Sequence, residues 1–323
     1  MTARVRAVVV NWNGAHLLDD CLGSLLAQDL PPGALEIVVV DNASSDDSVA
    51  VLRDRFPTVE VVENTVNRGF AGGVDAGLTN LDAPYVVLLN NDATFAPDAI
   101  SRLVEALEAS DGAHAGAATA HILLTEPDEQ GRTLVNSTGN VLTSAGSATD
   151  RDWLAVDGSI SPERRVFGFC GGAALLRTSA LAEVGTFDER LFLYYEDTDL
   201  SWRMRAAGWE TVYVSGAVAR HRHAASSDAS SPLFRYYNTR NSLLVFTRHA
   251  PAGVVVRSLA RQVLGAVRHA VLRSEPRPVV AARLRALRDY ARMLPTALAD
   301  RRRYWRRAVV DRRDVYRDAV VGG

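Results

Sequence analysis

The sequence predicts an α/β fold with a mainly parallel sheet, followed by a helical extension. Over the first 125 of the 323 residues, short apolar runs alternate with amphipathic stretches, which is typical of βαβ units. Several of these runs are apolar at consecutive positions, as in strands that are buried on both faces. From residue 235 to the end of the chain the periodicity is helical. This length accommodates one large domain with an appendage.

Each half of the domain has its own pattern. In the first half we expect strands at residues 5–11, 36–41, 59–63, 85–90 and 115–124, and helices near 15–28, 46–56, 71–81 and 97–110. Three of these strands end in polar residues, at 11–13, 41–42 and 90–92, and these ends outline one crevice because ligands collect at the carboxyl ends of such strands. Residues 125–165 have weak periodicity and no recognisable motif, so we expect a loop or hairpin insertion there. Strands at 167–177 and 210–214 and a helix at 196–207 complete a mixed second half.

Composition excludes several classes of protein. All 36 basic residues are arginine, which excludes P-loop NTPases and pyridoxal enzymes because both need a lysine. The two cysteines, Cys21 and Cys170, lack a C-x-x-C spacing and indicate neither a disulfide scaffold nor a cysteine zinc site. No secretory signal follows Met1, and no apolar run approaches the ~18 residues of a membrane span. We therefore expect a cytoplasmic protein.

The formal net charge of −2 conceals a split along the chain. Residues 1–247 carry 18 Arg and 32 acids, a charge of −14, whereas residues 248–323 carry 18 Arg and 6 acids, a charge of +12. The basic part is predicted to form amphipathic helices broken at Pro251, Pro276, Pro278 and Pro295. The first of these helices has one apolar stripe, which consists of Val256, Leu259, Val263, Val267 and Ala270.

Regular apolar stripes favour packing on protein or contact with lipid over binding along the phosphate backbone of a nucleic acid. No nucleic-acid partner is therefore expected. We expect residues 249–323 to rest on an anionic membrane, at the inner face of the plasma membrane. The alternative is that these helices pack on the domain or on a second copy of the chain, in a homodimer.

Asn90, Asn91 and Asp92 follow an apolar strand and form a candidate cation site. A carboxylate at a buried strand end, with amides before it, can present oxygen ligands to a divalent cation that also binds a diphosphate. The alternative is an Asx turn or a helix cap before Pro97.

Two other groups could carry chemistry. Acids at 196, 197 and 199 begin a predicted helix, where they either complement the helix dipole or provide a general base. His221 and His223 are structural, or one of them completes an O,N metal site with Asp92. Residues 67–73 lack the G-x-G-x-x-G spacing, so a dinucleotide site is rejected, while a close backbone approach to a ligand stays open.

Taken in order, seven motifs closely resemble the family 2 glycosyltransferases, and within them the bacterial branch that contains rhamnosyltransferases. They are VVVNWNG (8–14), VVVDNASSDDS (38–48), NRGFAGG (67–73), VVLLNNDA (86–93), GFCGGAALLR (168–177), VGTFDERLFLYYEDTDLSWRMRAAGW (184–209) and ARHRHAASS (219–227). The resemblance implies a GT-A (nucleotide-diphospho-sugar transferase) domain over residues 1–248. Its nucleotide-binding half is about 1–125 and its acceptor half about 165–248, and the extension 249–323 lies outside the match.

The resemblance also implies where the donor binds. Asp41 matches the acid that contacts the donor base, and Asn11 and Asn13 match the loop beside it. Asn67 and Arg68 match the segment that lies along the nucleotide.

The metal site follows from the same resemblance. Asn90, Asn91 and Asp92 occupy the place of the D-x-D motif, with Asn in place of the first Asp, which makes Asp92 the principal ligand for Mg²⁺ or Mn²⁺. His221 aligns with a histidine that completes this site in some relatives, and His223 is the alternative.

Catalytic and acceptor residues are expected in the second half. Glu196 and Asp197 match the family's ED pair, which makes Asp197 the expected base. Gly171, Gly172 and Trp202 are expected to border the acceptor, and their structural alternatives are a bulge for the glycines and a core position for the tryptophan.

The implied activity is a metal-dependent inverting transfer of one sugar, because the Q-x-x-R-W motif of processive members is missing. The favoured donor is dTDP-rhamnose, and the acceptor is a hydroxyl of a glycan, a lipid-linked sugar or a natural product. Alternative donors are a UDP-hexose or a galactofuranose nucleotide. A nucleotidyltransferase and a catalytically silent binding protein are the alternatives from other classes.

Overall fold

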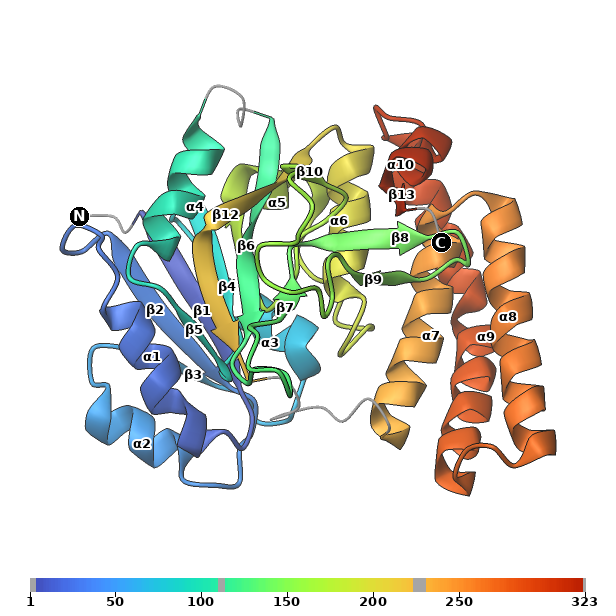
Figure 1. The fold of residues 1–323 in the computed structure, drawn as a ribbon, viewed down its shortest axis with the longest axis horizontal. Helices are drawn as coiled ribbons and strands as arrows, with labels where there is room; N and C mark the ends of the chain where they lie inside the picture. The colour runs from blue at the N-terminus through green and yellow to red at the C-terminus, as the bar shows by residue number, and fades with distance from the viewer. Residues whose placement is uncertain (1–3, 110–113, 223–230, 322–323) are drawn as a thin grey trace.

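The computed structural model describes residues 4–109, 114–222 and 231–321. Within these residues, a mixed ten-stranded sheet forms the centre and a helical lobe stands at its side (Figure 1). One face of the sheet packs on α1, α2 and α4, and the other face packs on α3, α5 and α6. This arrangement confirms the predicted α/β class.

The first half of the sheet is parallel, in the order β4-β1-β2-β3. Its strands are β1 (Val5–Asn11), β2 (Leu35–Asp41), β3 (Glu60–Glu63) and β4 (Tyr85–Leu89). The connections contain η1 (Ala15–Leu17), α1 (Leu18–Leu26), α2 (Ser48–Arg55), α3 (Gly69–Gly77), β5 (Ala93–Phe95) and α4 (Ala99–Glu108). The expected strands and helices are confirmed here, and β5 is an addition that pairs with β12.

Strand direction changes in the second half. β11 (Ala173–Arg177) runs antiparallel to both β4 and its other neighbour β6 (Ala115–Leu124). β12 (Glu210–His221) runs parallel to β6 and continues past the expected end at residue 214 through an irregularity between Val214 and Val218. The remaining elements are β10 (Arg165–Val166), α5 (Thr178–Val184) and α6 (Glu196–Ala206).

The insertion at 125–165 contains short strands. β7 (Val135–Ser137) pairs with β6, while β8 (Asn140–Thr143) and β9 (Ala148–Asp150) form an antiparallel hairpin. The end of the chain adds β13 (Val320–Val321), which pairs with β8 in parallel. The C-terminal segment therefore holds the hairpin beside the main domain.

The helical lobe consists of α7 (Pro232–His249), α8 (Ala252–Leu272), α9 (Arg277–Arg306) and α10 (Arg312–Ala319). The predicted breaks at Pro251, Pro276 and Pro278 coincide with the starts of α8 and α9. The break predicted at Pro295 is wrong, because that proline lies inside α9. Packing of α9 against α7, with Tyr290 and Ala297 buried on either side of the proline, offsets the lost backbone hydrogen bond.

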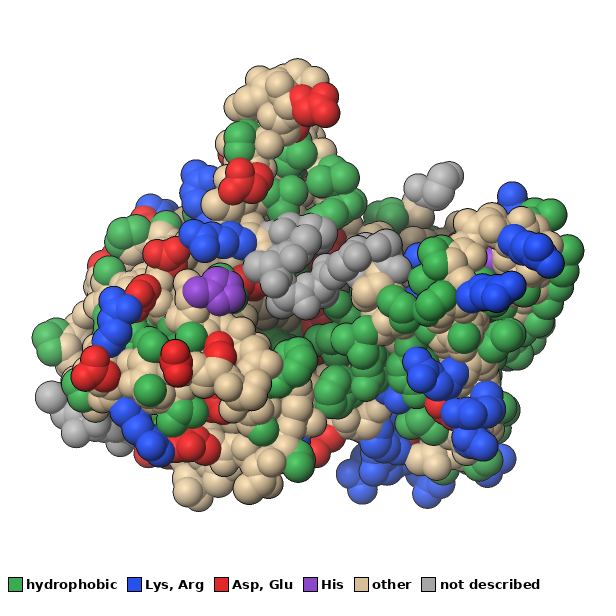
Figure 2. All heavy atoms as spheres, turned by 90° about the horizontal axis from the view of Figure 1, so that it is seen from below, with side chains coloured by type: hydrophobic (Ala, Val, Ile, Leu, Met, Phe, Trp, Pro, Cys, Tyr) green, Lys and Arg blue, Asp and Glu red, His purple; other side chains and the backbone are tan. Residues whose placement is uncertain are grey.

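α8 packs on the protein through one face and exposes an apolar stripe on another. Val254, Ser258 and Ala266 are buried. The exposed stripe, called the α8 stripe below, consists of Val256, Val263, Leu264, Val267 and Val271. Arginine side chains surround hydrophobic ones on this lobe (Figure 2). No helix in the described ranges is long and apolar enough to span a membrane.

Buried charges join α6 to α7. Asp199, which is 0% exposed, accepts hydrogen bonds from Arg203 at 2.9 Å and from Arg248 at 3.0 Å, and lies 3.0 Å from His249 Nε2. Burial opposes ionisation of Asp199, but Arg248 and Arg203 hold its pKa well below the usual range. Arg248 lies at the end of α7. The expected division of the chain at residue 248 stays a prediction.

Candidate active site

A short turn before β11, residues 170–172, links two of the predicted motifs. Because β11 is antiparallel to β4, its first residues lie at the carboxyl end of β4. The carbonyl of Gly172 accepts a hydrogen bond from the backbone N–H of Asn90 at 3.0 Å. The backbone N–H of Gly171 donates to Asp197 Oδ2 at 3.2 Å. The 170–172 turn therefore brings the start of α6 to the end of β4.

The two glycines of this turn leave open space. Neither has a positive φ. A Cβ added to Gly171 would lie 3.4 Å from the nearest atom, in Phe70, and one added to Gly172 would lie 3.4 Å from Asn90 Nδ2. Neither the backbone conformation nor severe crowding therefore requires glycine at these two positions. The space beside them agrees with close approach of a ligand.

On one side of the turn, Asp92 and His221 form an oxygen and nitrogen donor pair. Asp92 Oδ1 lies 3.0 Å from His221 Nε2, and Asp92 is 5% exposed. His221 Nδ1 lies 2.6 Å from Asn136 Oδ1, and this contact holds the ring with Nε2 directed toward Asp92. This donor set fits a divalent cation. His223 lies outside the described residues.

No three His, Cys, Asp or Glu side chains of the described residues gather closely enough to hold a cation by themselves. This finding is compatible with Mg²⁺ or Mn²⁺, since Mg²⁺ is typically held by one or two carboxylates together with water and substrate phosphates.

The predicted donor-binding residues meet at the ends of β1, β2 and β4. Asn91 Nδ2 donates to Asn11 Oδ1 at 2.9 Å, and Asn11 Nδ2 lies 3.4 Å from Asp41 Oδ1. Asn11 and Asp41 are buried. Asn13 is exposed beside them, and its side-chain oxygen accepts a hydrogen bond from the backbone N–H of Ser45 at 2.7 Å.

Packing within the protein largely explains the glycines of residues 67–73. Asn67 Oδ1 accepts a hydrogen bond from the backbone N–H of Gly69 at 2.8 Å, and Arg68 pairs with Glu189. A Cβ on Gly73 would lie 2.6 Å from Val10 Cγ1, so glycine lets α3 pack closely on β1. Asn67 and Arg68 are partly exposed at the start of α3.

Across the 170–172 turn, α6 begins with the acidic pair. Tyr194 and Tyr195 have positive φ values of 67° and 72°, a left-handed conformation that is costly for such residues and directs the chain into α6. Burial raises the pKa of Asp197, although hydrogen bonds from Asn140 and Gly171 oppose this shift. Burial and the Asp197 charge raise the pKa of Glu196 well above its usual range.

Trp202 lies in the hydrophobic core and not beside the turn. Its side chain is fully buried. Its ring centroid lies 5.4 Å from that of Phe167, 5.7 Å from that of His249 and 6.1 Å from that of Trp305. A tryptophan enclosed in this way cannot stack on a sugar, so the structure favours the core alternative.

Sequence reasoning missed three polar residues of the insertion. Asn136 orients His221, and Asn140 donates to Asp197. Asp150 interacts electrostatically with both Asp197 and His221. No periodicity or motif marks these residues, and only the strand pairing brings them to the site.

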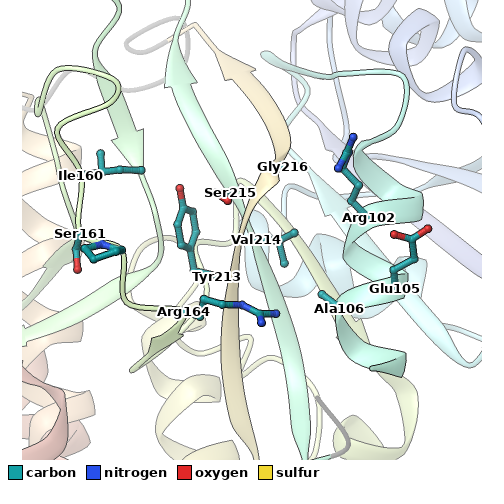
Figure 3. A pocket seen from close by; sticks show the side chains of 11 residues that line it. Arg102, Glu105, Ala106, Ile160, Ser161, Arg164, Tyr213, Val214, Ser215 and Gly216 are labelled. Carbon is teal, nitrogen blue, oxygen red and sulfur yellow. The ribbon is translucent and has the colours of Figure 1, made fainter. Parts of the chain in front are cut away.

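A separate cavity of about 700 Å³ lies between α4, β12 and the chain at 160–164 (Figure 3). Arg102, Tyr213 and Arg164 are among its lining residues. It contains none of the predicted site residues, so the candidate active site is placed at the strand ends.

Comparison with known proteins identifies the family of the chain. The family model described as "Glycosyl transferase family 2" matches residues 7–185, which include Asp41, Asp92 and the 170–172 turn. The chain is 30% identical over 264 residues to a Mycobacterium tuberculosis protein named N-acetylglucosaminyl-diphospho-decaprenol L-rhamnosyltransferase. That alignment covers 74% of this chain and 83% of the relative.

Two solved structures show the same GT-A fold. The mannosyltransferase PcManGT from Pyrobaculum calidifontis, in complex with GDP-Man and Mn²⁺, has a TM-score of 0.55 and 18% identity over 98% of this chain and 79% of its own. GalNAc-T7 with UDP, GalNAc and Mn²⁺ has a TM-score of 0.61 and 15% identity, covering 78% of this chain and 49% of its own.

Alanine substitutions at two glycines test the open space at the turn. We expect Gly172→Ala to leave the free energy of unfolding unchanged or to raise it by up to about 1 kcal/mol, because the added methyl group meets only ordinary contacts. Gly73→Ala should lower it by about 1–3 kcal/mol, because the methyl group would overlap Val10. Denaturant titration measures both values. Equal losses for the two variants would show that the turn itself requires glycine.

Proposed function

Because the chain belongs to glycosyl transferase family 2, we propose that this glycosyltransferase is a metal-dependent, inverting rhamnosyltransferase that adds one sugar from dTDP-rhamnose to a lipid-linked acceptor. The observation that carries the proposal is the position of Asp197 and the Asp92–His221 pair around one short turn. The name of the Mycobacterium tuberculosis relative supports the donor sugar and a polyprenyl-diphosphate-linked acceptor.

In this proposal Asp197 is the general base. It removes the proton from the acceptor hydroxyl while that oxygen attacks the anomeric carbon. Burial raises the pKa of Asp197, which makes the ionised carboxylate a better proton acceptor, and the Gly171 N–H holds it in place. Gly171 and Gly172 leave room for the reacting groups beside it. Glu196 precedes Asp197 in the acidic pair, and burial together with the Asp197 charge disfavours a second negative charge there.

Asp92 and His221 are the residues that would hold Mg²⁺ or Mn²⁺. Two structural neighbours contain Mn²⁺, which supports a divalent cation here. When bound, the cation would offset the negative charge that develops on the departing nucleoside diphosphate. Asn136 contributes by orienting the His221 ring.

The donor nucleotide would lie over the ends of β1 and β2. Asp41 and Asn11 present buried polar groups there, with Asn13 beside them. Asn67, Arg68, Asn90 and Asn91 would border the nucleotide and its phosphates. The same groups suit uracil and thymine, so UDP-hexose and UDP-galactofuranose belong in the donor screen.

Asp197→Asn tests the proposed function. We expect turnover with dTDP-rhamnose and a polyprenyl-diphosphate-linked N-acetylglucosamine to fall by about 10²–10⁴-fold, because the base is lost. Donor binding, measured by calorimetry with Mn²⁺ present, should survive. Release of dTDP reports the turnover.

The matched control is Glu60→Gln, which removes an exposed acid from β3 and should retain full activity. Full activity in Asp197→Asn would remove Asp197 from the role of base. Full activity of the unmodified protein in EDTA would remove the metal. Formation of a nucleotide sugar from a sugar phosphate and a nucleoside triphosphate would instead identify a nucleotidyltransferase.

We further propose that the α8 stripe contacts an anionic membrane, where a lipid-linked acceptor would reside. Exposed apolar side chains at helical spacing, flanked by Arg257, Arg261 and Arg268, suit the boundary between headgroups and acyl chains. Truncation of residues 249–323 is a poor test of membrane binding, because Arg248 and β13 both pack on the catalytic domain.

Point substitutions in the full chain provide the membrane test. We expect the unmodified protein to sediment with phosphatidylglycerol vesicles at low salt and to be released by high salt. Val263→Glu with Val267→Glu should abolish sedimentation without unfolding the protein, because both positions are exposed. Equal sedimentation of the two proteins would contradict the proposal, and dimerisation lost with the same substitutions would identify the stripe as a homodimer contact.

A further inference from the structure

A pocket in the helical lobe, apart from the candidate active site, is lined mostly by arginine. It lies where the end of α9 meets the start of α10 (Figure 1) and has a volume of about 610 Å³. The pocket, called the arginine pocket below, is lined by Leu298, Arg301, Arg302, Trp305, Arg306 and Arg312. The first five recur at helical spacing and form one face of α9, while the last comes from α10. Four guanidinium groups are thus gathered in one place.

Arg301 is held by the end of α7. Its Nη1 atom donates hydrogen bonds to the carbonyl oxygens of Thr247 at 2.8 Å and Ala250 at 2.7 Å. A cation there complements the negative end of the helix dipole, which is a structural reason for this arginine. Within the described residues, however, Nε and Nη2 of Arg301 donate no hydrogen bond. Two nitrogens of a fixed guanidinium therefore stay available to a ligand.

Arg312 is held by an aromatic ring. Its guanidinium carbon lies 4.8 Å from the centroid of the Trp305 ring, a distance at which the face of an indole attracts a cation. Trp305 is fixed in turn, because its Nε1 donates to the Arg248 carbonyl at 3.0 Å. A guanidinium that stacks on a ring keeps the N–H groups at its edge free to bind an anion. Arg301 and Arg312 are therefore positioned before any ligand arrives.

The acids nearest to these arginines in the chain bind other groups. Asp300 forms its ion pairs with three arginines that do not line the pocket, and Asp311 accepts a hydrogen bond from the Arg313 backbone N–H at 2.8 Å. Over the ranges that the structure describes, no acid forms an ion pair with an arginine of the pocket. Burial and the charge of Arg312 lower the pKa of Arg301 to about 10. The pocket therefore has a positive charge that a bound anion would offset.

We propose that the arginine pocket binds a phosphate group that carries more than one negative charge, as a phosphomonoester or a diphosphate does. Guanidinium groups bind phosphate oxygens through two parallel N–H bonds, and the fixed Arg301 and Arg312 suit this geometry. Arg302 and Arg306 are exposed at the rim, where their flexible side chains would close on the ligand. The inference does not depend on the proposed activity, because none of these residues lies at the candidate active site. Soluble molecules and lipid headgroups both present such a phosphate, so the test uses one probe of each kind.

Arg302→Gln with Arg306→Gln tests the site. Both side chains line the pocket and are exposed, so the double variant should fold normally. We expect inorganic pyrophosphate to bind the unmodified full chain in isothermal titration calorimetry, with EDTA present to keep cations from the candidate active site. The double substitution should raise the dissociation constant by about 10- to 100-fold, since hydrogen bonds between charged groups are lost. Arg312→Gln should raise it as well, and the melting temperature of each variant checks that it is folded.

Vesicles of phosphatidylcholine and phosphatidic acid test the lipid source, because the headgroup of phosphatidic acid is a phosphomonoester. Sedimentation that the double variant loses, without binding of pyrophosphate by the unmodified protein, would support the inference and identify a lipid headgroup as the ligand. Pyrophosphate binding that the double variant loses, with sedimentation unchanged, would support it and identify a soluble ligand.

The matched control is Arg307→Gln with Arg313→Gln. It removes the same charge from exposed neighbours of Arg306 and Arg312 that do not line the pocket. Binding of both probes should stay within about twofold of the unmodified protein, because exposed charges outside the pocket are screened by salt. Equal weakening in the control would show that net charge alone attracts the anion, and would overturn the inference. Failure of the unmodified protein to bind either probe would overturn it too.

Discussion

The antiparallel direction of β11 is the constraint on which the candidate active site depends. A strand that ran parallel to β4 would instead begin beside the amino end of β4. Because β11 runs the other way, the 170–172 turn lies at the carboxyl end of β4, where its backbone bonds to Asn90 and Asp197. One turn thus joins the half of the domain that would bind the nucleotide to the half that would bind the acceptor.

The rest of the chain stabilises this junction from outside. Asp199 lies two residues after Asp197 and is enclosed by Arg203, Arg248 and His249, so the start of α6 is tied to the end of α7. β13 and α8 hold the β8–β9 hairpin on its other side. The Arg-rich extension therefore has a structural role at the site in addition to any contact with a membrane.

Much of the fold and part of the site could be predicted from the sequence, for identifiable reasons. β1, β2 and β4 are apolar runs with polar ends, so both the strands and the residues after them, such as Asp41 and Asp92, are visible in the pattern. Asp150 was missed because the short strands of the insertion carry little periodicity and reach the site only through tertiary pairing. Trp202 is expected at the acceptor because a tryptophan can stack on a sugar face, but it lies on the face of α6 that enters the core.

A crystal structure of the full chain with Mn²⁺ and an intact nucleotide sugar would test the central claim most directly. We expect the anomalous signal of Mn²⁺ next to Asp92 Oδ1 and His221 Nε2, with the anomeric carbon between the metal and Asp197. Mn²⁺ bound away from Asp92, or a donor sugar whose anomeric carbon points away from Asp197, would contradict it.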